Sequence, residues 1–274
     1  MMLTGPMNGP SRITRAGLAS PARAAIGTTL AGSALSALSK APAQVAGLFH
    51  RRFPTVAVTG MTGVGKTQLA DRLSRHTPAP GTQEVGSAVM ERRTRRSAQG
   101  RGFRFRVVPG DNAATRLGAL DDVFHDEPVD GILHVVAYGH ATPRRAAGIT
   151  GSAVATPEAQ REAELEDWAI TAHRIAAMAV RRDKPVWLII CVTKADLFPD
   201  QVEDAVRYYS PGSGTPFGDK VDELRALAGG ARLSIDVLPV CSIGGPKGSP
   251  MSEKRCSELL TAVENRMSQL SGHH

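Results

Sequence analysis

The chain has 274 residues, of which 42% are hydrophobic and 22% charged, an ordinary composition for a folded protein with a sizeable core. Its three cysteines, Cys191, Cys241 and Cys256, are too few and too widely spaced for a disulfide framework or a zinc site, and they indicate a reducing, cytoplasmic location. The net charge of +7 is an N-terminal property, because residues 1–52 hold six basic residues and no acid, which leaves 27 basic against 26 acidic residues in the remainder. A nearly neutral body argues against a nucleic-acid binder with a broad basic face.

The sequence divides into a basic N-terminal tail, residues 1–52, and a body, residues 53–274. Glycine, proline, serine and alanine dominate the tail, which predicts that it is largely disordered. Within it, Ala22–Leu38 carries apolar residues at helical spacing. Three interpretations stay open: a weakly docked tail, an amphipathic helix that contacts a membrane surface or a partner, and a cleaved targeting peptide. No stretch reaches the roughly 18 uninterrupted apolar residues that a membrane span needs.

After Pro54, short apolar strands alternate with amphipathic helices. The expected strands are Thr55–Thr59, Val85–Arg96, Gly102–Val108, Gly131–Tyr138, Pro185–Thr193 and Ser234–Val240. The expected helices are Lys66–His76, Thr115–Phe124, Pro157–Arg182, Asp219–Ala228 and Ser252–Leu270. Residues 139–157 are rich in glycine, alanine and threonine and are expected to form an insertion or loop. This alternation predicts an α/β fold of three layers, in which helices cover both faces of a mostly parallel six-stranded sheet.

A glycine-rich loop follows the first expected strand directly. Its residues are Gly60, Met61, Thr62, Gly63, Val64, Gly65, Lys66 and Thr67. They fit the phosphate-binding pattern G-x-x-x-x-G-K-[ST] without a mismatch. In such a P-loop the glycines let backbone N–H groups turn toward phosphate oxygens, Lys66 reaches the β- and γ-phosphates, and the Thr67 hydroxyl binds magnesium. The sequence therefore predicts a P-loop nucleoside-triphosphatase fold that binds a purine nucleoside triphosphate with magnesium.

A second motif stands at the end of the most apolar strand and consists of Thr193, Lys194 and Asp196. With the P-loop ahead of it, the chain resembles the Ras-like and translation-factor class of P-loop GTPases, whose fourth motif is [NT]-K-x-D. The resemblance implies that Asp196 accepts two hydrogen bonds from the guanine edge and that the stem of Lys194 packs on the base. GTP and GDP are then the expected ligands, and buried polar readout of this kind discriminates between bases by factors on the order of 10⁴.

Two further motifs of that class match in part. The fifth motif falls on Cys241, Ser242 and Ile243, which follow a strand and form a degenerate match. The third motif, D-x-x-G, falls on residues 107–110, where Gly110 is kept but Val107 replaces the aspartate. An apolar side chain cannot hold a magnesium-bound water, so the resemblance implies reduced metal affinity and slow hydrolysis.

Candidates to complete the metal and water site come from the loops. Asp111 follows Gly110 at the position where the class carries the residue that orients the attacking water; together with Lys66 it is the catalytic candidate, and the alternative is that it only caps the next helix. Thr82 is the best-placed threonine for the first switch, where the class uses a hydroxyl as a magnesium ligand, and Thr77 is the second choice.

Seven arginines and no acid lie between residues 92 and 106, along the expected hairpin. Strand alternation predicts that about half of them point to each face, with some solvated or paired. One interpretation is a surface for an effector, an acidic lipid or RNA. The other is a charged edge strand that resists aggregation.

Three hypotheses for function follow. The first is a slow GTPase that acts as a molecular switch and is read by a protein effector. The second is a module that binds GTP with little hydrolysis. The third is an ATP-dependent kinase or ATPase that uses the same P-loop; it predicts a preference for ATP and indifference to substitution of Asp196.

Overall fold

The computed structural model describes residues 53–75, 90–96, 102–110, 113–142, 156–242 and 250–272. Its strands are β1 (Thr55–Thr59), β2 (Glu91–Arg96), β3 (Gly102–Val107), β4 (Gly131–Val136), β5 (Val186–Val192) and β6 (Leu233–Pro239). They form one six-stranded sheet in the order β2-β3-β1-β4-β5-β6. Every neighbouring pair is parallel except β2 and β3, which are antiparallel. The predicted mostly parallel, six-stranded sheet is therefore confirmed. The expected tail and the expected strand residues 85–89 lie outside the described ranges.

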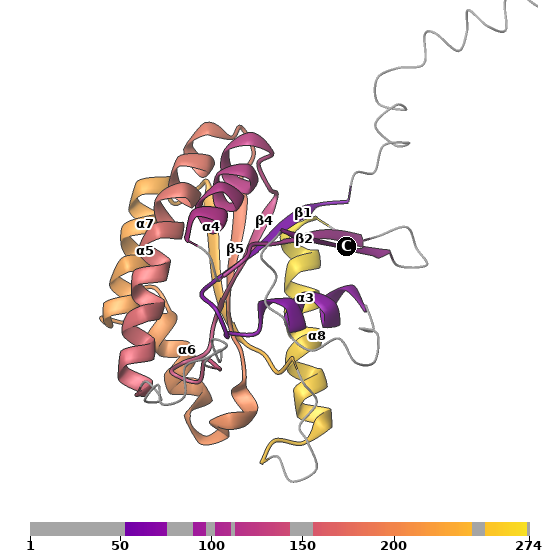
Figure 1. Ribbon diagram of the computed structural model, residues 1–274, viewed down its shortest axis with the longest axis vertical. Helices are drawn as coiled ribbons and strands as arrows, with labels where there is room; N and C mark the ends of the chain where they lie inside the picture. Colours follow the sequence, from indigo (N-terminus) through magenta and orange to yellow (C-terminus); the bar gives the residue numbers. More distant parts are fainter. Residues whose placement is uncertain are drawn as a thin grey trace, which may run out of the picture. The chain divides into compact units, whose positions relative to one another are not determined.

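Helices cover both faces of the sheet (Figure 1). On one face lie α3 (Lys66–Ser74) and α8 (Glu253–Leu270). On the other lie α4 (Ala113–Asp121), α5 (Pro157–Arg181), α6 (Val202–Tyr209) and α7 (Pro216–Ala228). This gives the three layers that the sequence predicts. Within the described residues, no helix is both long enough and apolar enough to cross a membrane.

Two apolar clusters fill the spaces above and below the sheet, because successive residues of a strand point to opposite faces. Val58 and Val135 belong to the cluster under α3 and α8, whereas Ala57 and Val136 belong to the cluster under α4–α7. Every residue of β5 is buried, as expected for a central parallel strand with helices on both sides. The core thus fixes the carboxyl ends of β1, β4 and β5 side by side.

Three helices begin at a hydroxyl cap that the sequence supplies. The side chains of Thr156, Thr215 and Ser252 each accept a backbone N–H three residues further on, at 3.1–3.2 Å. A proline occupies the first turn of α5 and of α7, where its missing N–H is not needed. Helix α5 begins at the predicted residue, and α8 begins one residue after the predicted start. Helix α6 was not predicted.

The arginine-rich hairpin of β2 and β3 sends its side chains to both faces, as predicted. Arg93 and Arg95 form ion pairs with carboxylates of β2, α3 and α8. Arg106, on the opposite face, is buried and pairs with two carboxylates that follow α4. Arg92 and Arg104 are exposed. Three of these five arginines therefore hold the sheet to its helices, and two face solvent.

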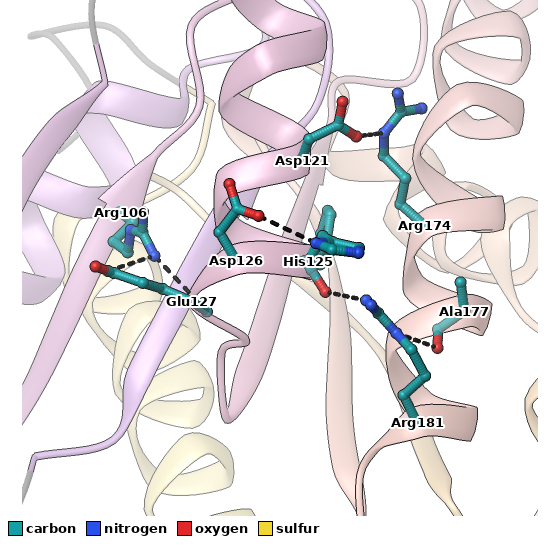
Figure 2. A network of polar contacts seen from close by, with 9 residues as sticks. Arg106, Asp121, His125, Asp126, Glu127, Arg174, Ala177 and Arg181 are labelled. Atoms are coloured by element: carbon teal, nitrogen blue, oxygen red, sulfur yellow. Dashed lines mark hydrogen bonds and ion pairs between the residues drawn. The ribbon is translucent and has the colours of Figure 1, made fainter.

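Ion pairs also anchor the segment that continues α4 (Figure 2). The α4 helix ends at Asp121, whose Oδ1 accepts a hydrogen bond from Arg174 Nε of α5 at 2.8 Å. The next turn, η1 (Asp122–Asp126), offers the carbonyl oxygen of Phe124 to Arg181 at 2.9 Å. Arg106 reaches the residue that follows η1. These contacts fix the carboxyl end of α4, whose amino end follows the third motif.

Candidate nucleotide-binding site

The P-loop connects β1 to α3 at the carboxyl edge of the sheet. Gly60, Gly63 and Gly65 have φ angles of 128°, 82° and 97°, which favour glycine. A Cβ atom on Gly60 would lie 2.2 Å from the carbonyl oxygen of Val135, and one on Gly63 would lie 2.2 Å from that of Thr142. Both glycines are therefore required by close backbone neighbours as well as by their dihedral angles.

Lys66 is the charged group at the centre of this loop. Its side chain is 8% exposed, and its Nζ donates to the carbonyl oxygens of Gly60 and Met61, both at 2.8 Å. Gly110 lies against the same ammonium, since a Cβ on Gly110 would be 2.8 Å from Lys66 Nζ and 2.6 Å from Thr62 Oγ1. The glycine of the third motif is thus brought to the P-loop lysine, although 44 residues separate them in the chain.

The fourth motif is folded onto the P-loop by hydrogen bonds. The backbone of Lys194 is left-handed, with φ 58°, and its Nζ donates to Gly63 O at 2.9 Å, His140 O at 2.8 Å and Thr142 Oγ1 at 2.6 Å. The buried Thr193 hydroxyl lies 2.6 Å from the carbonyl oxygen of Val64. The end of β5, the P-loop and the segment after β4 therefore form one hydrogen-bonded unit.

Asp196 meets the fifth motif. The Cys241 thiol donates to Asp196 Oδ1, with Sγ and oxygen 3.0 Å apart. Burial, and then the hydrogen bond to Asp196, raise the pKa of the Cys241 thiol, which keeps the proton on sulfur and makes the thiol a donor. Ser242 follows, buried, and its hydroxyl has no hydrogen-bond partner among the described residues. Asp196 is thereby oriented, and it stays partly exposed.

The structure describes some of the residues that the sequence suggested as metal ligands. Thr67, in the first turn of α3, is partly exposed and offers a hydroxyl. Val107 is 3% exposed and packs in the apolar cluster under α3 and α8, so this position offers no oxygen ligand. The other candidates lie outside the described residues: Thr77, Thr82, Asp111 and Ile243. Within the described part, no group of three or more His, Cys, Asp or Glu side chains could hold a metal ion. One hydroxyl beside a phosphate loop suits magnesium, which keeps several waters and takes substrate phosphates as ligands.

Sequence reasoning missed two residues that complete the unit, His140 and Thr142. Both accept from Lys194, yet they lie in a segment that carries no motif and was expected to be part of an insertion or loop. Burial, Lys194 and Arg161 together lower the pKa of His140, in that order of importance. No spacing rule points to these acceptors, because their role depends on how the turn after β4 folds.

Comparisons with known proteins find similar solved structures of low sequence identity. No family model matches the chain, and no curated protein matches its sequence. A GTP-binding protein from the archaeon Sulfolobus solfataricus, solved with GDP, is 13% identical, with a TM-score of 0.45 over 88% of this chain and 58% of that chain. A bacterial selenocysteine-specific elongation factor is 14% identical, with a TM-score of 0.46 over 81% of this chain and 29% of that chain. The mammalian SRP receptor structure is 14% identical, with a TM-score of 0.49 over 79% of this chain and 99% of that chain.

The chain thus spans 58% and 29% of the first two proteins that it resembles. Its own sheet has a single antiparallel edge strand, the P-loop connects β1 to α3, and the Thr-Lys-x-Asp motif stands at the end of β5. This protein has the three-layer α/β fold of a P-loop nucleoside triphosphatase.

Proposed function

We propose that this protein binds guanine nucleotides with magnesium and hydrolyses GTP slowly, as a switch read by a protein partner. One observation carries the proposal: the Lys194 ammonium donates to Gly63 O of the P-loop at 2.9 Å. That bond fixes the end of β5 beside the phosphate loop. A nucleotide with its phosphates on the loop would therefore have its base next to Lys194 and Asp196.

The phosphate end of the site is built for charge neutralisation. The P-loop amides, the amino end of α3 and the Lys66 ammonium all favour bound phosphate. Magnesium, held by Thr67 and the phosphates, would supply further positive charge at the β- and γ-phosphates. Phosphoryl transfer in such sites depends on positioning and electrostatics, with little covalent chemistry by the protein. Gly110 lies against Lys66, so a γ-phosphate bound to Lys66 would contact the segment that leads into α4.

The base end of the site supports guanine. A carboxylate accepts from both N1–H and the 2-amino group of guanine, whereas adenine presents no matching pair of donors. The Cys241 thiol donates one hydrogen bond to Asp196 Oδ1, so Oδ2 and the second lone pair of Oδ1 stay available for the two donors of guanine. The ATP-dependent alternative assigns no role to this carboxylate.

Slow turnover follows from the third motif. Val107 is buried among apolar side chains and can neither bind a magnesium-held water nor orient an attacking one. A nucleotide-binding module without useful hydrolysis differs from a slow GTPase only in the rate of phosphate release under single-turnover conditions. If Asp111 supplies the missing carboxylate, Asp111→Ala abolishes that release and leaves GDP affinity nearly unchanged.

The decisive experiment is calorimetric titration of nucleotide-free protein with GDP, GTP, XDP and ATP in magnesium buffer, for the wild type, Asp196→Asn and Asp200→Asn. An asparagine at 196 offers one acceptor and one donor, which match N1–H and the 2-carbonyl of xanthine. We expect Asp196→Asn to lose GDP binding and to gain XDP binding, and the exposed Asp200→Asn control to keep the wild-type preference. ATP binding that equals GDP binding and is unaffected by Asp196→Asn would refute the proposal and favour a kinase or ATPase.

A further inference from the structure

A buried carboxylate of α5 forms hydrogen bonds with the segment that follows β4. Glu164 is 1% exposed, and its Oε1 accepts the backbone N–H of Ala137 at 2.7 Å. Its other oxygen, Oε2, accepts the hydroxyl of Tyr209, the last residue of α6. The Tyr209 oxygen in turn accepts the N–H of Tyr138 at 3.1 Å. Because a buried charge is costly unless it is fully hydrogen-bonded, such a residue in mid-helix requires a reason.

The two amides that this pair satisfies belong to the segment where the chain leaves β4, residues 137–142. Tyr138 has φ 50°, a left-handed conformation that is uncommon for a residue with a bulky side chain. The turn closes when His140 N–H donates to Ala137 O at 2.9 Å. Glu164 and Tyr209 therefore fix this strained turn by accepting hydrogen bonds from its first two backbone amides.

The same turn supports the phosphate loop from its other side. Thr142 N–H donates to Gly63 O at 3.0 Å, and Lys194 joins Gly63 O, His140 O and Thr142 Oγ1 with one ammonium group. A short series of hydrogen bonds thus runs from Glu164 through residues 137–142 to the P-loop. Every bond in this series joins two atoms of the protein itself.

We propose that Glu164 and Tyr209 are positioning residues for nucleotide binding, which keep residues 137–142 in the conformation that supports Gly63 and Lys194. They act through the turn and touch no nucleotide atom. The inference rests on the proposed function for its consequence, since a loosened turn releases nucleotide faster. Its structural part, the placement of the turn against Gly63, can be tested without nucleotide.

The ionisation of Glu164 gives this role a pH signature. The charged and titratable groups around it are Arg161 and Asp167 on α5, Tyr208 and Tyr209 on α6, and Tyr138 and His140 on the turn. Burial raises the pKa of Glu164 to about 7, against the opposing hydrogen bonds from Tyr209 and Ala137. Protonation removes the charge that both donors serve and so weakens both hydrogen bonds. Nucleotide release in the wild type is therefore expected to accelerate as the pH falls from 8 to 6.

The experiment compares Tyr209→Phe and Glu164→Gln with two matched controls. Tyr208→Phe removes a hydroxyl from the adjacent ring of the same aromatic cluster, and Glu166→Gln makes the same change at an exposed position of α5. The rate of release of a fluorescent GDP analogue is measured by chase with excess GDP, and the urea midpoint is measured in parallel. Loss of one charge-assisted hydrogen bond corresponds to about tenfold faster release, which we expect for the two test variants only. We also expect Glu164→Gln to abolish the acceleration between pH 8 and pH 6.

Release at the wild-type rate in both test variants, or a lowered urea midpoint with unchanged release, would overturn the inference and leave a purely structural pair. Hydrogen exchange of the Thr142 amide in nucleotide-free protein separates this failure from failure of the proposed function. Loss of its protection in Tyr209→Phe, but not in Tyr208→Phe, supports the positioning role even if GDP does not bind. Unchanged protection refutes that role even if GDP binds tightly.

Discussion

The close approach of the P-loop to the turn after β4 can be measured with a pair of alanine substitutions. Gly63→Ala and Gly65→Ala both place a Cβ at a positive φ, 82° and 97°, for which the strain is about 1–2 kcal/mol. The two sites differ in what the new atom meets. At Gly65 the nearest neighbour is Gln68 Oε1 at 3.7 Å, an ordinary contact, whereas at Gly63 it is Thr142 O at 2.2 Å.

The difference between the two variants can be worked out from the hydrogen bonds at Gly63. Opening the Gly63–Thr142 contact by at least about 1.2 Å, from 2.2 Å to an ordinary contact of 3.4 Å, breaks the bond from Thr142 N–H to Gly63 O. It also breaks one bond of the Lys194 ammonium. A neutral hydrogen bond contributes about 1 kcal/mol and a charged one about 1.5–3 kcal/mol. We therefore expect Gly63→Ala to cost about 2.5–4 kcal/mol more than Gly65→Ala.

Urea unfolding is a suitable assay, because both tryptophans of the chain are buried and report on the core. Gly118→Ala is the control of opposite sign: its Cβ meets nothing within 4 Å in α4, and we expect it to raise stability by about 0.5–1 kcal/mol. Equal costs for Gly63→Ala and Gly65→Ala would show that the turn is not fixed against the P-loop, and would refute the reasoning.

Three further outcomes are expected. Gly131→Ala places a Cβ 2.1 Å from the Trp187 ring and should cost about 2–3 kcal/mol in urea unfolding with a shift in tryptophan emission; wild-type stability would contradict that packing. Burial lowers the pKa of His134 from 6.5 to about 3, so only the unfolded chain takes up this proton in that window, and stability falls with falling pH by at most about 1.4 kcal/mol per unit. The raised pKa of Glu164 has the opposite effect, because it makes the free energy of unfolding rise as the pH falls from 7 to 4.5. The contribution of His134 is therefore measured as the difference in pH dependence of stability between the wild type and His134→Gln. Parallel plots of unfolding free energy against pH for the two proteins would exclude it. Thr193→Val removes a buried donor to a P-loop carbonyl and should cost about 1–3 kcal/mol without change of shape, a loss that Thr193→Ser should largely avoid.

Much of the fold follows from local signals in the sequence. The apolar run of β5 and the hydroxyl caps of α5 and α8 are local features, and the predicted bounds of these elements agree with the structure to within about one residue. Helix α6 was missed because it has only eight residues, too few for its apolar spacing to be told from a loop.

The candidate site contains residues that a local motif identifies and residues that only the tertiary structure identifies. The P-loop and the Thr193–Asp196 motif are contiguous, so their residue types identify them. Glu164 lies in the middle of an amphipathic helix, where a carboxylate normally belongs to the solvated face. It is buried instead because the amide of Ala137, 27 residues away, needs an acceptor once β4 has ended. This contact between Glu164 and Ala137 forms only when the chain folds, so no local pattern of residue types predicts it.

The two carbonyl oxygens that accept hydrogen bonds from Lys66 affect the energetics of phosphate binding at this residue. Its ammonium already has partners in Gly60 and Met61, so an incoming phosphate exchanges one set of oxygens for another at the same nitrogen. The loop itself therefore supplies hydrogen-bond acceptors for the buried Lys66 charge. The affinity of Lys66 for phosphate is then the difference between its hydrogen bonds to phosphate oxygens and its hydrogen bonds to these two carbonyl oxygens.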